Sequence, residues 1–387
     1  MAKVVIVIPT YNERDNTQRM IDALASEFPK ISGHQMEVLY VDGNSPDGTG
    51  ELVKTNQKKH KWLHLLVETK KEGLGKAYAK GFKYAMEKLK ADYVMEFDGD
   101  FQHRPDEIKK LVAKIDEGYE YIIGSRYIPG GSIPKEWGFN RKFLSVVGNL
   151  VARIGLLLPK VHDLTTGFKL TKVKGVLDRI DLDHLYSNSF AYKVHILAAC
   201  VWGGAKVSEV PINFMAREKG ESKLIKNEML ETLKVIFLFQ IHNPKIIRFV
   251  KFGTVGFVGF LVNYIGLEAF RKLGMTTYLA TLFATELAII SNFIFNNIWT
   301  FKDKIITKIS DVVPQFIKFN VSSLFAVIVQ PLIVAGGAKL FGDTSIVRLM
   351  ALLFVLVVVI IPYNYAVYNI FIWKTWKLPF KIPGVKA

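Results

Sequence analysis

In the first third of the chain, short runs of β-branched and aromatic residues alternate with stretches whose apolar residues recur at helical spacing. This alternation predicts βαβ units and a parallel sheet, with the chemistry gathered at the carboxyl ends of the strands. The expected strands are residues 3–8, 36–41, 63–67, 92–97 and 120–123, and the expected helices are residues 15–28, 50–59, 75–90 and 106–116.

Two later stretches, residues 139–158 and 224–244, predict amphipathic helices because apolar residues recur at helical spacing in both. Ordinary helices packed on the sheet would show the same pattern. Basic residues beside the first stretch, such as Arg141 and Arg153, favour helices that lie in the headgroup region of a membrane.

Four long apolar segments follow, near residues 247–270, 278–301, 316–340 and 346–373, and each is about long enough to cross a bilayer. Their short connections at 271–277 and 341–345 predict two hairpins. Lysines gather in the loop 302–308 and in the tail 374–386. Because cytoplasmic loops carry the excess of Lys and Arg, we expect an integral protein of the cell membrane with the N-terminal domain and both termini in the cytoplasm.

The charge of the chain fits this division. Of 387 residues, 51 are Lys or Arg and 35 are Asp or Glu, which gives a net charge of +16. Residues 245–387 hold 15 basic and 5 acidic side chains, so most of the positive net charge belongs to the apolar C-terminal part of the chain. Membrane topology and anionic lipid explain a positive charge there. Nucleic acid is therefore not an expected partner. The single cysteine, Cys200, excludes an intrachain disulfide.

The strongest chemical signal is the segment FDGDFQH at residues 97–103, which follows a predicted strand. Residues two apart on an extended chain face the same side, so Asp98, Asp100 and Gln102 are expected to direct their oxygens at one point. Such oxygen ligands suit Mg²⁺ or Mn²⁺. A solvated Asp-Gly turn is the alternative, but the longer DxDxQH pattern at a strand end favours a metal site.

A second signal follows the first two strands, where the chain reads Pro9-Thr10-Tyr11-Asn12-Glu13 and Val41-Asp42. The glycine-rich fingerprint of a dinucleotide site is absent after the first strand. An aromatic ring near carboxylates can stack on a base and accept hydrogen bonds from it. A Pro-led turn with Glu13 capping the next helix is the alternative for the first loop alone.

Arginines near the acidic segment suggest a phosphate site. Arg126 follows a strand, and Arg141 and Ser145 share one face of the predicted helix 139–158. Guanidinium groups favour phosphate, so these three residues suit a lipid phosphate at a membrane surface. Nonspecific contact of a basic face with anionic headgroups is the alternative. His103 is expected to steady the metal site, and Asp163 to shape the acceptor loop.

Six motifs occur together and in order: VIPTYNE, VDGNSPDGT, FDGDFQH, GSRYIPGG, DLTTGFKL and GESK. With them, residues 3–223 resemble family 2 glycosyltransferases of the GT-A fold, and within these most closely the dolichol-phosphate mannose synthases and related polyprenyl-phosphate glycosyltransferases. The C-terminal part resembles small four-helix membrane proteins of the GtrA type. The resemblance implies an α/β GT-A domain over residues 1–223 that includes the first amphipathic helix, a second amphipathic helix at 224–244, and a four-helix transmembrane domain over 245–387.

The resemblance also implies roles for individual residues. Guanosine would be held by Pro9, Tyr11, Glu13, Val41 and Asp42. Asp98, with Gly99, would contact the nucleotide sugar, and Asp100 with Gln102 would bind the metal on the diphosphate. Arg217 and Lys223 would close on the donor phosphates. Two departures from the family are Gly43, where relatives often have a second acid, and Gly99, where alanine is usual.

The activity implied is the inverting transfer of mannose from GDP-mannose to dolichyl or another polyprenyl phosphate. A phosphate monoester is largely dianionic at neutral pH because its second pKa is near ~6, so no general base is needed. Three alternatives remain: transfer of glucose from UDP-glucose to the same lipid, a processive polysaccharide synthase, and a lipid-sugar flippase with a regulatory soluble domain. The expected partners are the donor, the lipid phosphate and the bilayer, with no obligate protein partner.

Overall fold

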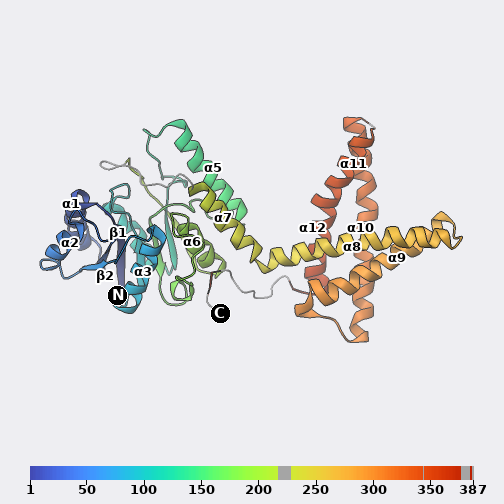
Figure 1. Ribbon diagram of the computed structural model, residues 1–387, viewed down its shortest axis with the longest axis horizontal. Coiled ribbons are helices and arrows are strands. Elements are labelled where there is room, and N and C mark those ends of the chain that lie inside the picture. Colours follow the sequence, from blue (N-terminus) through green and yellow to red (C-terminus); the bar gives the residue numbers. More distant parts are fainter. Residues whose placement is uncertain (217–227, 343, 376–383, 386–387) are drawn as a thin grey trace. The chain divides into compact units, whose positions relative to one another are not determined.

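The computed structural model describes residues 1–216, 228–342, 344–375 and 384–385. The chain divides into two compact units (Figure 1). The first holds residues 1–242 together with the tail residues 384–385, and the second lies within residues 243–380.

The first unit is built on a seven-stranded sheet with the strand order β3-β2-β1-β4-β6-β5-β7. The five predicted strands are confirmed, with ends shifted by a few residues. Strands β1 to β4 are parallel, but β6 runs antiparallel to both of its neighbours, so the expectation of a wholly parallel sheet is wrong at this strand. The strands are β1 (Ala2–Thr10), β2 (His34–Asp42), β3 (Leu63–Val67), β4 (Tyr93–Glu96), β5 (Tyr121–Ser125), β6 (Lys169–Lys172) and β7 (Val207–Pro211).

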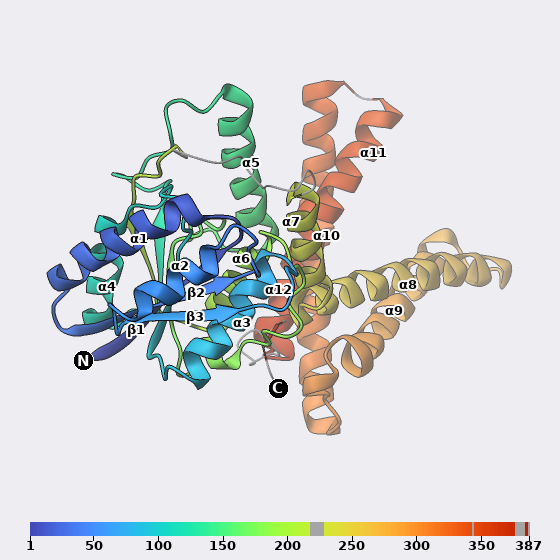
Figure 2. The ribbon, with the colours of Figure 1, turned by 60° about the vertical axis from the view of Figure 1, so that its left-hand side comes forward.

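Helices cover both faces of this sheet (Figures 1 and 2). Val4, Ile6 and Ile8 of β1 pack with helices on one face, while Val5 and Val7 pack with helices on the other. Full burial of one such side chain stabilises the fold by about 1.5–3 kcal/mol. Because the apolar side chains of β1 point alternately to the two faces, both faces have to be covered by helices. The first face carries α1 (Arg14–Glu27), α2 (Thr49–Gln57) and α4 (Ile108–Asp116), and the second carries α3 (Leu74–Glu87), α6 (Tyr192–Trp202) and α7 (Glu228–Ile241).

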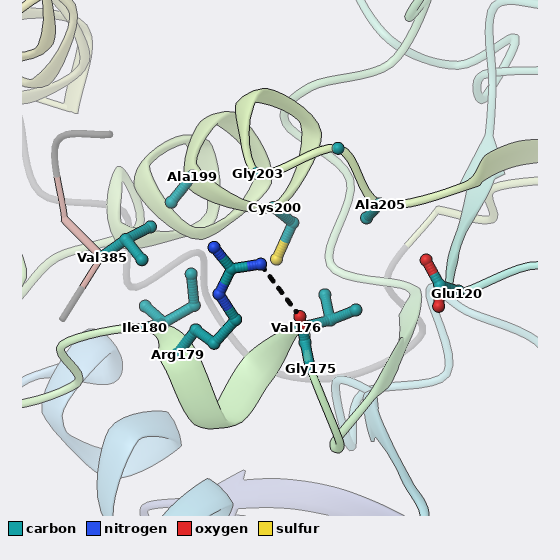
Figure 3. Close-up of a pocket in the computed structure, with 11 residues that line it drawn as sticks. Glu120, Gly175, Val176, Arg179, Ile180, Ala199, Cys200, Gly203, Ala205 and Val385 are labelled. Atoms are coloured by element: carbon teal, nitrogen blue, oxygen red, sulfur yellow. Dashed lines mark hydrogen bonds between the residues drawn. The ribbon is translucent and has the colours of Figure 1, made fainter. Parts of the chain in front are cut away.

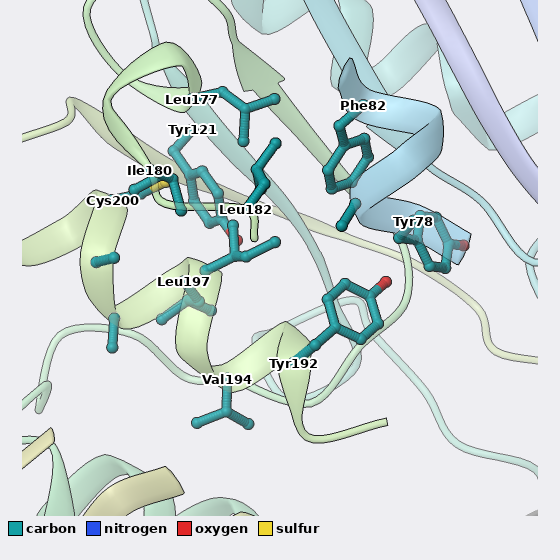
Figure 4. Packing of buried hydrophobic residues seen from close by; sticks show 14 of the residues in the cluster. Tyr78, Phe82, Tyr121, Leu177, Ile180, Leu182, Tyr192, Val194, Leu197 and Cys200 are labelled. Carbon is teal, nitrogen blue, oxygen red and sulfur yellow. The ribbon is translucent and has the colours of Figure 1, made fainter. Parts of the chain in front are cut away.

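Helix α3 lies unusually close to the sheet because Gly81 has no side chain. A Cβ at this position would come within 2.5 Å of Val7 Cγ1 and 2.9 Å of Val41 Cγ2. The buried cluster on this face includes Tyr78 of α3 and Tyr192 of α6, whose rings stack with centroids 5.1 Å apart (Figure 4). The packing therefore brings one end of α3 and one end of α6 together.

Helices α5 (Phe139–Gly155) and α7 pack against each other and expose apolar residues on their outer surfaces. The contact is close, because a Cβ at Gly155 would approach Ile236 Cγ2 to 2.7 Å. Both helices lie where the sequence predicts amphipathic helices, although residues 224–227 lie outside the described part of the chain. The exposed apolar side chains include Phe139, Phe143, Leu150 and Ile154 of α5 and Leu230 and Phe237 of α7.

The second unit is helical over all four predicted apolar segments. Helix α8 packs along α9, and α10 packs along α11. Within the described residues, the stretches Pro244–Lys272 and Val355–Ile372 are long and apolar enough to cross a membrane. Four crossings in two hairpins stay a prediction. The helices are α8 (Pro244–Lys272), α9 (Thr277–Phe295), α10 (Ile309–Phe341), α11 (Ser345–Phe354) and α12 (Ile361–Val367), with π-helical turns at Asn296–Thr300, Val355–Ile360 and Tyr368–Ile372.

Candidate active site

The acidic segment directly follows β4, but it is not extended. Strand β4 ends at Glu96, residues 99–103 form turns and bends, and Phe101 has a left-handed backbone with φ of +61°. The expectation that alternation along a strand aligns the three side chains is therefore wrong. The segment forms a turn instead, in which the backbone N–H of Gln102 donates to Asp100 Oδ1 at 3.1 Å. Such a backbone in a non-glycine residue costs free energy and is often found at functional sites.

Both carboxylate oxygens of Asp98 accept a hydrogen bond. The Tyr78 hydroxyl donates to Oδ1 at 3.0 Å, and the Lys193 ammonium donates to Oδ2 at 3.3 Å. Burial on its own would raise the pKa of Asp98, but the Lys193 cation and these hydrogen bonds outweigh it and lower that pKa. Asp98 is therefore a negatively charged group at neutral pH, with a cation built in beside it.

Asp100 and Gln102 carry oxygen atoms of the kind that Mg²⁺ and Mn²⁺ prefer. Asp100 is 7% exposed. The Gln102 side chain donates through Nε2 to the carbonyl of Met215 at 3.3 Å, which leaves its Oε1 as an acceptor. Within the described ranges, no three His, Cys, Asp or Glu residues form a metal-binding group. The donor chemistry fits a hard cation that takes its other ligands from substrate oxygens and water.

The acidic segment also contacts a residue far along the sequence. The backbone N–H of Met215, two residues before Arg217, donates to the carbonyl of Gln102 at 2.9 Å. Arg217 and Lys223 themselves lie outside the described residues.

His103 is almost fully buried among the rings of Phe97, Phe168 and Phe214. Burial lowers its pKa to about 3, so the imidazole is neutral at physiological pH. Its Nε2 lies 3.9 Å from Asp98 Oδ2. The predicted supporting role of His103 stays a prediction.

The first two strands bring the predicted base-binding residues to the same edge. Their register pairs Pro9 with Val41 and Thr10 with Asp42. The Tyr11 ring has the Lys71 ammonium 4.1 Å from its centroid. A Cβ at Gly43 would lie 3.3 Å from this ring, so the glycine that replaces the usual second acid makes room for Tyr11.

The carboxylates of these two loops hold the loops themselves. Asp42 is 2% exposed, and it accepts hydrogen bonds from the Thr10 hydroxyl and from the backbone and hydroxyl of Ser45. Glu13 begins α1 with its carbonyl, and its side chain accepts from Asn16 Nδ2 at 2.9 Å. Direct contact of Asp42 and Glu13 with a base stays a prediction.

Arg126 follows β5 and is bound to Asp163 in a buried, bidentate ion pair. Its Nε and Nη2 lie 2.8 Å from the two Asp163 oxygens, and Nη2 also donates to the Thr165 hydroxyl at 2.8 Å. Burial would raise the pKa of Asp163, but the Arg126 guanidinium outweighs it and lowers that pKa. Asp163 also accepts from the backbone of Thr166, so the pair fixes the loop 163–167. Direct contact of Arg126 with phosphate stays a prediction.

Two further predicted residues lie on α5. Ser145 Oγ lies 2.6 Å from the hydroxyl of Tyr127, the residue after Arg126, so the structure brings Ser145 to the end of β5. The Arg141 guanidinium lies over the Trp137 ring at 4.1 Å. Arg141 and Ser145 are one turn apart and occupy one face of α5.

Sequence reasoning missed Tyr78 and Lys193, and with them a buried polar network. Glu96 and Lys169 face each other across β4 and β6, Tyr192 donates to Glu96 at 2.8 Å, and Lys169 donates to the Lys193 carbonyl at 3.2 Å. Burial lowers the pKa of Lys169 to about 8. The sequence did offer one sign of this network. Lys193 stands at the start of an otherwise apolar helix, and a lysine is almost never fully buried unless it has a partner, so an acidic partner could have been expected.

A separate pocket lies among Glu120, Arg179, Cys200 and the tail residue Val385 (Figure 3). The Arg179 side chain donates to the Gly175 carbonyl. Burial raises the pKa of the Cys200 thiol, so this cysteine is inert rather than nucleophilic. None of the predicted site residues lines this pocket.

Two family models match the chain. Residues 5–178 match "Glycosyl transferase family 2", and residues 251–373 match "GtrA/DPMS, transmembrane domain". The protein is thus an enzyme, a glycosyltransferase with a membrane domain. The chain belongs to glycosyltransferase family 2, in the branch that carries a GtrA/DPMS transmembrane domain.

Curated relatives agree with this assignment. The chain is 34% identical over 331 residues to a dolichol-phosphate mannosyltransferase of Pyrococcus furiosus, covering 85% of this chain and 88% of that protein. It is 34% identical over 237 residues to a polyprenol monophosphomannose synthase of Mycolicibacterium smegmatis, covering 60% and 84%. A mannosyltransferase of Pyrobaculum calidifontis, solved with GDP-Man and Mn²⁺, is 14% identical over 96% of this chain and 87% of that chain, with a TM-score of 0.39. That likeness is too distant to carry an argument about the site.

The buried Arg126–Asp163 pair predicts a large effect on stability. Asp163→Ala leaves a buried guanidinium without its partner and is expected to lower the free energy of unfolding by about 3 kcal/mol. Asp106→Ala, which removes the exposed partner of Arg104, is the control and is expected to cost less than about 1 kcal/mol. Unfolding of the full chain in detergent measures both.

The pH dependence follows from the lowered pKa of Asp163. A carboxyl with a lowered folded pKa contributes stability above its unfolded pKa of about 3.9, and this contribution is lost as the pH falls through the folded value. The difference between the wild type and Asp163→Ala is therefore expected to shrink below pH ~4. If Asp163→Ala and the control Asp106→Ala lowered the free energy of unfolding equally at neutral pH, this account of the Arg126–Asp163 pair would be contradicted.

Proposed function

We propose that the enzyme transfers mannose from GDP-mannose to the phosphate of dolichol or another polyprenol, giving the lipid-linked phosphomannose and GDP. The observation that carries the proposal is that the acidic segment after β4 and the Tyr11 loop after β1 meet at one edge of the sheet, in a unit whose α5 and α7 expose apolar surfaces. The names of the relatives, which are mannosyltransferases of polyprenyl phosphates, support this choice of sugar and acceptor.

On the donor side, the Tyr11 ring offers a stacking surface for guanine, and Pro9 and Val41 are the apolar neighbours that the strand register pairs. Asp42 fixes its loop through Thr10 and Ser45, and Glu13 begins the helix that follows. Asp98 and Gly99 face the sugar, and Arg217 and Lys223 bind the donor phosphates in this proposal. Asp100 and Gln102 would hold a Mg²⁺ or Mn²⁺ ion, which would supply positive charge against the diphosphate.

The reaction is an in-line displacement at the anomeric carbon. An oxygen of the lipid phosphate dianion forms the new bond to this carbon as the bond to GDP breaks, so the configuration inverts. Because the nucleophile is already deprotonated, no general base is required. Burial lowers the pKa of His103 to about 3, which makes it a weak base at neutral pH, so a mechanism without a general base is consistent with its position beside the acidic segment. The residues of the chain position the donor and acceptor, and proximity supplies much of the rate.

On the acceptor side, we propose that Arg141 and Ser145 bind the lipid phosphate, while the Arg126–Asp163 pair holds the loop beside them. The exposed apolar side chains of α5 and α7 would enter the headgroup region of the membrane, where a polyprenyl phosphate presents its phosphate. The second unit would cross the cell membrane four times as two hairpins, with both termini in the cytoplasm.

A transfer assay tests the proposal. Full-length protein in detergent is incubated with dolichyl phosphate, Mn²⁺ or Mg²⁺, and radiolabelled GDP-mannose or UDP-glucose. We expect label from GDP-mannose to enter the organic phase. Asp100→Asn is expected to lower the rate by at least about 100-fold, because one preorganised electrostatic contact is worth that much in a transition state.

Asp106→Asn is the matched control, because this nearby carboxylate pairs with Arg104 at the surface and is expected to leave the rate unchanged. Transfer from UDP-glucose alone would overturn the donor. The absence of a lipid product from either donor would overturn the transferase proposal.

Arg141 tests the acceptor site separately. Arg141→Gln is expected to raise the KM for dolichyl phosphate roughly tenfold, the equivalent of one charge-assisted hydrogen bond, without changing the KM for the donor. Lys142→Gln, whose amine donates to the Lys135 carbonyl instead, is the control on the same helix. A similar rise in KM for both variants would mean that α5 provides only nonspecific positive charge.

A further inference from the structure

Lys193 is buried completely at the first turn of α6, and its ammonium is directed at Asp98. The ammonium lies 3.3 Å from Asp98 Oδ2 and 4.3 Å from the centroid of the Phe190 ring. The Tyr78 hydroxyl, from α3, binds the other oxygen of Asp98 at 3.0 Å. Two helices on one face of the sheet therefore hold the carboxylate from both sides.

The loop 163–167 lies against this ion pair as well. A Cβ at Gly167 would collide with both the Lys193 ammonium and Asp98 Oδ2. Because the Arg126–Asp163 pair fixes this loop, the ammonium has little room to leave the carboxylate. The Asp98–Lys193 pair is thus a fixed part of the site.

Glu96 and Lys169 face each other across β4 and β6 beneath the site. Lys169 also binds the backbone carbonyl of Lys193, which fixes the start of α6. Removing the Lys193 charge would take away the cation that lies 3.3 Å from Asp98 Oδ2.

A divalent cation bound to Asp98 would lie beside the buried ammonium of Lys193, and like charges repel. We propose that Lys193 is a positioning residue that holds Asp98 as an acceptor for the hydroxyl groups of the donor and keeps it out of the metal's ligands. Asp100 and Gln102 are then the ligands that this segment supplies. The division of roles agrees with the one that the family resemblance implies and differs from the residue pattern alone, in which Asp98 also binds the metal; the new element is the part played by Lys193. The inference rests on the proposed function for the identity of the donor.

The test is Mn²⁺ binding to full-length Lys193→Met, which keeps the length of the side chain and removes the charge. Electron paramagnetic resonance measures free Mn²⁺, with the metal alone and with GDP. We expect the variant to bind Mn²⁺ more tightly by roughly tenfold, at the lower end of the effects that neighbours of metal ligands have on affinity. In the transfer assay, kcat is expected to fall while the KM for dolichyl phosphate is unchanged.

Two further variants keep the test decisive. In the double variant Lys193→Met with Asp98→Asn both charges are absent, so we expect its Mn²⁺ affinity to return to the wild-type value. The double variant also has no unpaired charge at this place, so it can be measured if Lys193→Met alone does not fold. Lys83→Met is the control for loss of a lysine. Lys83 lies on α3 and pairs with Asp183, and this variant is expected to bind Mn²⁺ as the wild type does.

Wild-type or weaker Mn²⁺ affinity in a folded Lys193→Met would overturn the inference. If the single variant does not fold, affinity in the double variant that differs from the wild type would overturn it as well. Binding of Mn²⁺ alone needs neither sugar nor lipid. A wild-type protein that transfers no mannose would therefore refute the proposed function and leave this inference to be judged by its own measurement.

Discussion

A buried ammonium has to be compensated, and the requirement of Lys193 for a countercharge organises the site. A charged group out of water is costly unless it is paired and hydrogen-bonded. Strand β4 delivers Asp98, α3 supplies the Tyr78 hydroxyl and α6 supplies the Lys193 ammonium. The positions of two helices on the sheet are thus tied to one side chain at its edge.

A second buried ion pair extends this constraint to the loop 163–167, on the side where we propose that the acceptor binds. Arg126 and Asp163 fix the loop 163–167, and Gly167 of that loop packs against the Asp98–Lys193 pair. Ser145 reaches the same region from α5 through Tyr127. The donor edge and the helix with the exposed apolar face are therefore connected through a short series of rigid contacts. This connection is what an enzyme needs when one substrate is soluble and the other is a membrane lipid.

The sequence predicts the first half of the fold well, because β1 to β5 and their helices have clean periodicities. It does not predict β6, where Lys169 interrupts the apolar pattern and is buried with its ammonium bound to the backbone carbonyls of Leu164 and Lys193. Lys193 was missed because its partner Asp98 is 95 residues away in the sequence.

The chemistry of the acidic segment could be predicted from its residue types, but its shape could not. Alternation along a strand was the wrong basis, because the chain turns after β4 and Phe101 takes a left-handed backbone. The sequence also could not tell that Asp42 would be bound by Thr10 and Ser45. In each case a tertiary contact decides what a side chain is available to do.

The most direct test of the central claim is anomalous diffraction from Mn²⁺ in crystals of the full-length protein grown with GDP. The account predicts one manganese peak at the carboxyl edge of the sheet, ligated by Asp100 and Gln102, with Asp98 still bound to Lys193. A manganese ion ligated by Asp98 with the lysine displaced, or a peak away from this edge, would contradict it.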